Sequence, residues 1–159
     1  MQSPKLRSFT IASIILFSIA IIQIVWNWSL LPDEIPTHYN ALGQPDRFGH
    51  KAFIFVPPFL GLIVWAVLHF VALFSITPPS TVDTEHRKEK QIRNTQMMLQ
   101  IIGNEVLLIL TMFSFKEVYT AKGGRFSLGA LEMIFVIVVL VGTILYFTHR
   151  NSQLKNNDL

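Results

Sequence analysis

The chain of 159 residues is 51% hydrophobic and only 14% charged, with a formal net charge of +3. A water-soluble domain usually carries about 25% charged residues, so the composition excludes an ordinary soluble protein, and the length suits one domain. The small positive charge is spread over the predicted loops, so it does not indicate a nucleic-acid surface. Because the sequence has no cysteine, disulfides, cysteine metal sites and a thiol nucleophile are excluded.

Two long runs, residues 8–31 and 52–76, contain no Lys, Arg, Asp or Glu. Each is long enough for a helix to cross the roughly 30 Å hydrocarbon core, which needs about 20 apolar residues. The first run is also longer than the apolar part of a signal peptide, so we expect it to be retained. With two further apolar segments, the sequence predicts an all-α bundle of four membrane helices in a single domain. The predicted spans are residues 9–28, 53–76, 97–115 and 126–147.

The third predicted span is the most polar. Gln96, Gln100 and Asn104 recur at every fourth residue, so they form one stripe along a helix. Such a stripe is expected to face neighbouring helices and not lipid. The polar segment 80–96 before it is predicted to be helical and to continue directly into the span.

Glu105 lies near the middle of the third span, where a charged side chain costs roughly 2.5–3.5 kcal/mol. His69 lies at a similar depth in the antiparallel second span and is the candidate partner of Glu105. One hypothesis is a proton or ion pathway through Glu105, Asn104 and His69. The alternative is a cluster of interhelical hydrogen bonds that fixes the packing.

The distribution of Lys and Arg predicts the orientation. Eight lie before the first span, between the second and third spans, or after the fourth, whereas five lie in the other two loops. Because cytoplasmic loops are enriched in Lys and Arg, we expect both termini in the cytoplasm and the loop 31–51 outside the cell membrane. The segment 80–96 would then be a candidate docking site for a cytoplasmic regulator.

The loop 31–51 is rich in turn-forming residues and contains three prolines. Pro36 favours an extended conformation at the preceding residue. Residues 40–43 suit a turn with Gly43 at positive φ, and residues 44–47 suit a second turn with Pro45 at its second position. The pattern predicts a compact, ordered cap over the bundle.

The same loop is similar to the family called domain of unknown function 1648, whose signature combines Leu-Pro, Ile-Pro-x-His-aromatic-Asn, Gly, Pro-Asp, aromatic-Gly and Lys. The resemblance implies a multi-pass bacterial membrane protein. It also implies kinship with an immunity and signalling protein that protects against a sporulation-delaying peptide toxin. The matching residues are Leu31, Pro32, Ile35, Pro36, His38, Tyr39, Asn40, Gly43, Pro45, Asp46, Phe48, Gly49 and Lys51.

The polar residues of the loop allow two interpretations. His38, Asp46 and His50 are potential ligands of a divalent metal ion, which would suit a metal-dependent membrane enzyme, but their spacing matches no known ligand pattern. In the structural interpretation, Asn40 and Asp46 accept hydrogen bonds from turn amides, while His38 and Lys51 bond loop carbonyls or carboxylates. We favour the structural interpretation and expect neither enzymatic activity nor a cofactor.

The sequence therefore predicts a small non-enzymatic membrane protein with a role in immunity, envelope stress or signalling. Its loop would be a structural cap or would recognise a peptide toxin or envelope component, and its other partner is the lipid bilayer. The alternative functions are a proton- or ion-coupled transporter or accessory subunit using Glu105 and His69, and the metal-dependent enzyme.

Overall fold

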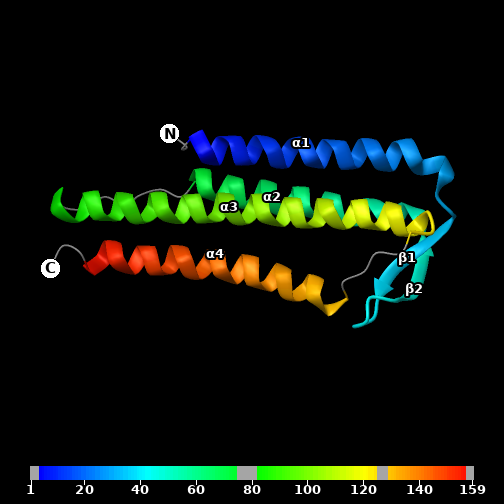
Figure 1. Ribbon diagram of the computed structural model, residues 1–159. Coiled ribbons are helices and arrows are strands. Elements are labelled where there is room, and N and C mark those ends of the chain that lie inside the picture. The colour runs from blue at the N-terminus through cyan, green and yellow to red at the C-terminus, as the bar shows by residue number, and fades with distance from the viewer. Residues whose placement is uncertain (1–3, 75–81, 125–128, 157–159) are drawn as a thin grey trace.

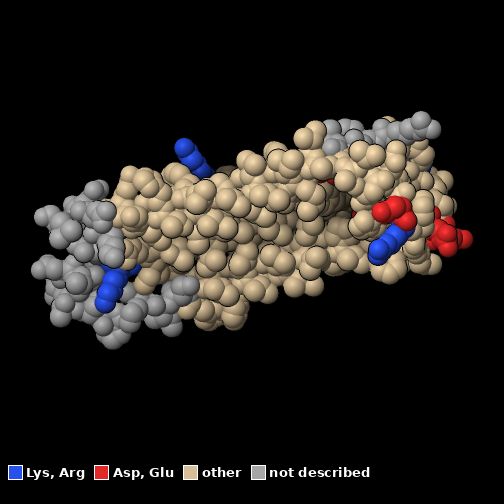
Figure 2. Space-filling model, turned by 90° about the horizontal axis from the view of Figure 1, so that it is seen from below, with Lys and Arg blue, Asp and Glu red and all other residues tan. Residues whose placement is uncertain are grey.

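The computed structural model describes residues 4–74, 82–124 and 129–156 and shows four long helices lying side by side, with a small hairpin at one end (Figure 1). All four helices are long and apolar enough to cross a membrane, as predicted. Lys, Arg, Asp and Glu gather toward the two ends of the face in Figure 2, and a long uncharged band lies between them. The helices are α1 (Pro4–Asn27), α2 (Val56–Phe74), α3 (Val82–Ala121) and α4 (Ala130–Asn156).

Helix α3 is the centre of the bundle and packs against each of the other three helices. It continues without a break from the polar segment into the third span, as predicted. Its 40 residues correspond to roughly 60 Å at about 1.5 Å per residue, which is about twice the thickness of the hydrocarbon core. The predicted start of the fourth span at Phe126 lies outside the described residues, as does the polar segment's first residue, Ser80.

Small residues allow α2 and α3 to approach closely. A Cβ atom at Gly61 of α2 would lie 3.2 Å from the Cβ of Leu110, and one at Gly103 of α3 would lie 3.2 Å from Nδ1 of His69. Within a membrane, helix association depends on such close packing because lipid tails are as apolar as the helices. Pro57 and Pro58 fall in the first turn of α2, where a missing N–H breaks no helical hydrogen bond.

The loop 31–51 contains an antiparallel β-hairpin, made of β1 (Glu34–Tyr39) and β2 (Pro45–His50). Gly43 has a φ of 75°, so the predicted turn at residues 40–43 is correct. The second predicted turn, at residues 44–47, is wrong because these residues run into β2. Pro45 occupies the first position of that strand, where its missing N–H removes no ladder bond.

The hairpin is attached to the bundle by a buried apolar cluster at its base. Two short 3₁₀ segments, Trp28–Leu30 and Lys51–Phe55, connect the strands to α1 and α2. Ile35 of β1 is 1% exposed and lies in this cluster, so the hairpin and the helices share one core. The buried members are Ile24, Leu31, Ile35, Ile54 and Val118.

Candidate functional site

The hairpin carries a polar pair that is partly exposed on its surface. The Nδ1 atom of His38 lies 2.5 Å from Oδ1 of Asp46, and both side chains are partly exposed, at 55% and 41%. The prediction that Asp46 accepts from turn amides is therefore wrong, because its carboxylate bonds the imidazole on the facing strand. Asn40 does cap the turn as predicted, since its Oδ1 accepts from the amides of Leu42 and Gln44 at 2.9 and 3.0 Å.

The three potential metal ligands of the loop do not converge. His50 lies at the base of the hairpin opposite Glu34, and its Nδ1 accepts from the amide of Ala52 at 3.2 Å. His38 lies closer to the tip, paired with Arg47 in the strand register. Across residues 4–74, 82–124 and 129–156, no group of three or more His, Cys, Asp or Glu side chains is placed to hold a metal ion.

Two lysines fasten the hairpin to the helices. Lys51 lies 3.1 Å from Oδ1 of Asp33 and 5.2 Å from the ring centre of Trp28, which is a cation–π distance. Lys116, near the end of α3, lies 4.8 Å from the ring centre of Tyr39. Burial, followed by the negative charge of Glu117, raises the pKa of Tyr39 above its ordinary value of 10.0.

Lys116 also forms an ion pair that links two helices. Its Nζ donates to both carboxylate oxygens of Glu132 on α4, at 2.7 and 2.6 Å. The two side chains are only 13% and 16% exposed, so this pair is largely withdrawn from solvent. The same ammonium group therefore joins the hairpin, α3 and α4.

The tip of the hairpin contacts the start of α4. The amide of Ala130 donates to the carbonyl oxygen of Ala41 at 3.1 Å. Gly129, with a φ of 56°, makes this approach possible, because a Cβ atom there would lie 2.8 Å from that same oxygen. Only glycine adopts such a conformation at little cost.

Replacing Gly129 with Ala is expected to push the hairpin tip away from α4. The added Cβ meets a backbone atom, and the positive φ disfavours any side chain, so we expect a loss of about 1–2 kcal/mol in this contact. Hydrogen exchange of the amides in residues 40–44 should quicken. Gly142→Ala is the matched control, because Gly142 lies inside helix α4 and no atom lies within 4 Å of the added Cβ. In this variant the hydrogen exchange of the hairpin amides should not change.

Within the membrane spans, Asn104 joins three helices. Its side chain is fully buried, its Nδ2 donates to Oγ1 of Thr10 on α1 at 2.9 Å, and its Oδ1 accepts from Nε1 of Trp65 on α2 at 2.8 Å. Gln100, one turn earlier on α3, is 6% exposed. The predicted polar stripe therefore does face the neighbouring helices.

Glu105 and His69 do not form the predicted pair. Glu105 faces α4, where its Oε1 accepts from Oγ1 of Thr143 at 2.7 Å. His69 faces α3, with its ring against Gly103, and its Nδ1 donates to the carbonyl oxygen of Trp65 at 2.9 Å. The two groups therefore lie in different helix interfaces.

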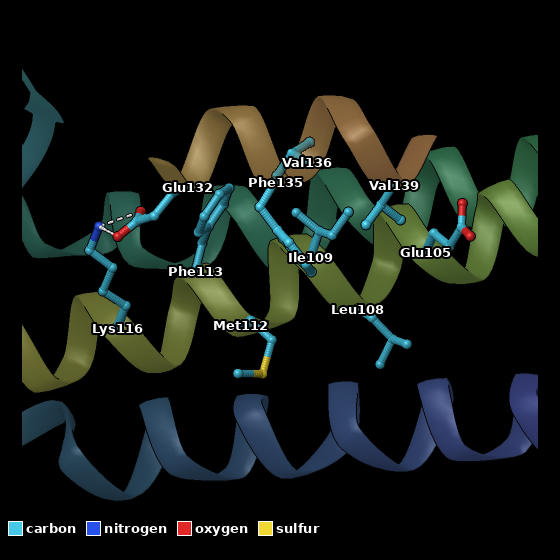
Figure 3. A pocket seen from close by; sticks show the side chains of 10 residues that line it. All are labelled: Glu105, Leu108, Ile109, Met112, Phe113, Lys116, Glu132, Phe135, Val136 and Val139. Atoms are coloured by element: carbon cyan, nitrogen blue, oxygen red, sulfur yellow. Dashed lines mark hydrogen bonds and ion pairs between the residues drawn. The ribbon is translucent and has the colours of Figure 1, made fainter. Parts of the chain in front are cut away.

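A groove runs along the interface of α3 and α4 (Figure 3). It has a volume of about 410 Å³, with Glu105 at one end and the Lys116–Glu132 pair at the other. Between these ends the walls are apolar. The apolar lining residues are Leu108, Ile109, Met112, Phe113, Phe135, Val136 and Val139.

Sequence reasoning missed the Lys116–Glu132 pair and the partners Thr10, Trp65 and Thr143. One signal was present, because Lys116 lies at the end of the third predicted span and Glu132 lies near the start of the fourth. Antiparallel neighbours place such residues at similar depth. The hydroxyl and indole partners gave no signal, because Thr and Trp carry no charge and do not stand out within an apolar span.

The comparisons with known proteins agree with the predicted resemblance. A protein of Archaeoglobus fulgidus, described as an uncharacterized protein, is 28% identical over 80 residues, which cover 47% of this chain and 44% of that relative. The match thus spans less than half the length of the relative. No solved structure matches the chain.

The family model of the domain of unknown function DUF1648 matches residues 14–62. This range takes in most of α1, the whole hairpin and the beginning of α2. The resemblance predicted from the loop is therefore confirmed. The segment that resembles this family is therefore the one in which the hairpin connects the first two membrane helices.

Proposed function

We propose that the protein is a non-enzymatic membrane receptor or immunity protein whose hairpin binds a peptide or envelope component outside the membrane. The observation that carries this proposal is the contrast between the two sides of the hairpin. One side is fixed by the apolar core, Lys51 and Lys116, whereas Leu42 is 77% exposed and Phe48 is 61% exposed.

An ordered loop with exposed apolar side chains fits recognition better than it fits a simple connection. Holding Leu42 and Phe48 in water costs free energy, and binding residues are often carried on loops that a rigid scaffold positions. The His38–Asp46 pair lies on the same hairpin and supplies polar contacts. The outer edge of β2 also offers unpaired backbone groups to an extended peptide.

The orientation predicted from the Lys and Arg distribution supports an external position for the hairpin. In that orientation the helical segment 82–96 extends into the cytoplasm, where it would contact a regulator. A signal would then consist of ligand binding at the hairpin and a change in that regulator at the opposite end of α3.

The test is protection of a bacterial host against membrane-permeabilising peptides. Cells expressing the chain are challenged with a panel of such peptides, and the inhibitory concentrations are compared with those of cells carrying the double variant Leu42→Ser, Phe48→Ser. We expect the variant to reach the membrane in normal amounts, because neither side chain supports the core. It should nevertheless lose the protection, because the proposed binding surface is changed.

The control is Glu105→Gln, which leaves the hairpin unchanged. It should protect as well as the wild-type chain. If Glu105→Gln alone abolishes protection while the hairpin variant retains it, the recognition proposal is wrong and a transport function through α3 is favoured. Lack of protection by the wild-type chain against every peptide would contradict the immunity role.

A further inference from the structure

The groove between α3 and α4 combines a long apolar wall with one acidic side chain, Glu105, for which residues 4–74, 82–124 and 129–156 supply no ion-pair partner. At the end of the groove opposite Glu105, Lys116 donates to both oxygens of Glu132, so the charges of this pair largely cancel. Glu105 is 11 residues from Lys116 along α3, which corresponds to roughly 16 Å at about 1.5 Å per residue. The excess negative charge of the groove therefore belongs to Glu105 when its carboxyl group is ionised.

The carboxyl group of Glu105 is only half satisfied. Oε1 accepts from Thr143, but Oε2 is buried and has no hydrogen-bond partner within residues 4–74, 82–124 and 129–156. An ionised carboxylate in such surroundings is costly unless an opposite charge lies beside it. Figure 3 shows the carboxyl group at the end of the groove, beyond the apolar side chains.

The walls of the groove define the rest of the ligand. Phe113 and Phe135 both line it and offer apolar ring surface to the apolar groups of a ligand. Met112 adds a flexible, polarisable side chain that adapts to ligands of different shape. A small hydrated metal ion would leave these apolar walls uncovered, and an anion would be repelled by Glu105.

We propose that this groove binds a lipophilic organic cation, whose positive centre pairs with Glu105 and whose apolar groups fill the space up to the Lys116–Glu132 pair. The volume of about 410 Å³ lies within the range of small-molecule sites, roughly 300–1,000 Å³. This site is separate from the hairpin, so it does not depend on the recognition function proposed above.

The test compares two ions of nearly identical shape and opposite charge, tetraphenylphosphonium and tetraphenylborate. Binding of each to the purified protein in detergent is measured by equilibrium dialysis. We expect saturable binding of tetraphenylphosphonium and none of tetraphenylborate. Glu105→Gln should weaken tetraphenylphosphonium binding at least tenfold, whereas Asp33→Asn, at an 89% exposed carboxylate outside the groove, should leave it unchanged.

A steric pair of variants tests the location. Val136 lines the groove, whereas Val138 of the same helix is 63% exposed on its outer side. Val136→Phe should reduce binding at least tenfold, and Val138→Phe should not. Helix content and melting temperature, measured by circular dichroism, ensure that only folded variants are compared.

Three results would each overturn the proposal. They are equal binding of the two ions, unchanged affinity for tetraphenylphosphonium in folded Glu105→Gln protein, and equal effects of the two valine variants. None of these results bears on protection by the hairpin, so the groove and the recognition function fail or succeed independently.

Discussion

Replacement of Lys116 by Met is expected to destabilise the protein by about 3–5 kcal/mol, because it breaks a largely buried ion pair on one side. The change removes the ammonium group that donates to both oxygens of the Glu132 carboxylate, which is only 16% exposed. It also removes the cation over the ring of Tyr39 and thus loosens the hairpin. Unfolding in mixed detergent micelles, followed by circular dichroism, measures the loss.

The double variant Lys116→Met, Glu132→Met separates the charge from the packing. Breaking a buried ion pair on one side is costly, whereas replacing both partners with apolar residues is often neutral or stabilising. We therefore expect the double variant to recover most of the lost stability. If it is no more stable than the Lys116 single variant, the ion pair is not the source of the effect, and lost packing against Tyr39 is responsible.

Asn104→Leu is expected to lower stability by about 1–3 kcal/mol, because it removes the side chain that hydrogen-bonds α1 and α2 to α3. Thr10 keeps its hydrogen bond to the carbonyl oxygen of Leu6, but Nε1 of Trp65 loses the acceptor Oδ1. Detergent unfolding gives the loss of stability, and the shift of tryptophan emission reports the changed surroundings of Trp65.

Two further variants control for this interpretation. In the background of Asn104→Leu, the change Trp65→Phe removes the unpaired donor, so its additional cost should be smaller than in the wild-type chain. Met112→Leu alters a 59% exposed position on the same helix and should change stability by less than about 0.5 kcal/mol. An equal loss in Asn104→Leu and Met112→Leu would show that the hydrogen bonds contribute nothing specific.

The helices could be predicted because membrane spans have a strong signal in composition. The polar stripe was also correct, because Gln100 and Asn104 are four residues apart and therefore lie on one face. The prediction that Glu105 pairs with His69 was wrong for the same geometric reason. Depth in the membrane follows from position along a helix, but Glu105 is rotated by about 100° from Asn104 and so faces a different neighbour.

The hairpin was harder to predict than the spans. Pro45 suggested a turn, yet it begins a strand, because strand formation depends on cross-strand contacts more than on local preference. The His38–Asp46 pair exists only because the turn at Gly43 folds β2 back onto β1. Both residues could therefore be recognised in the sequence as polar loop residues, but the contact between them could not be predicted.

The position of α3 between the other helices has a consequence for how the molecule moves. Helix α1 barely contacts α2, and α4 has no substantial contact with either within the described residues. The other three helices therefore pack on α3 separately and do not form a closed ring around it. In a closed ring, displacing one helix disturbs both of its neighbours. Here a displacement of α4 would disturb only its contacts with α3, among them Lys116–Glu132 and Thr143–Glu105, and its contact with the hairpin tip.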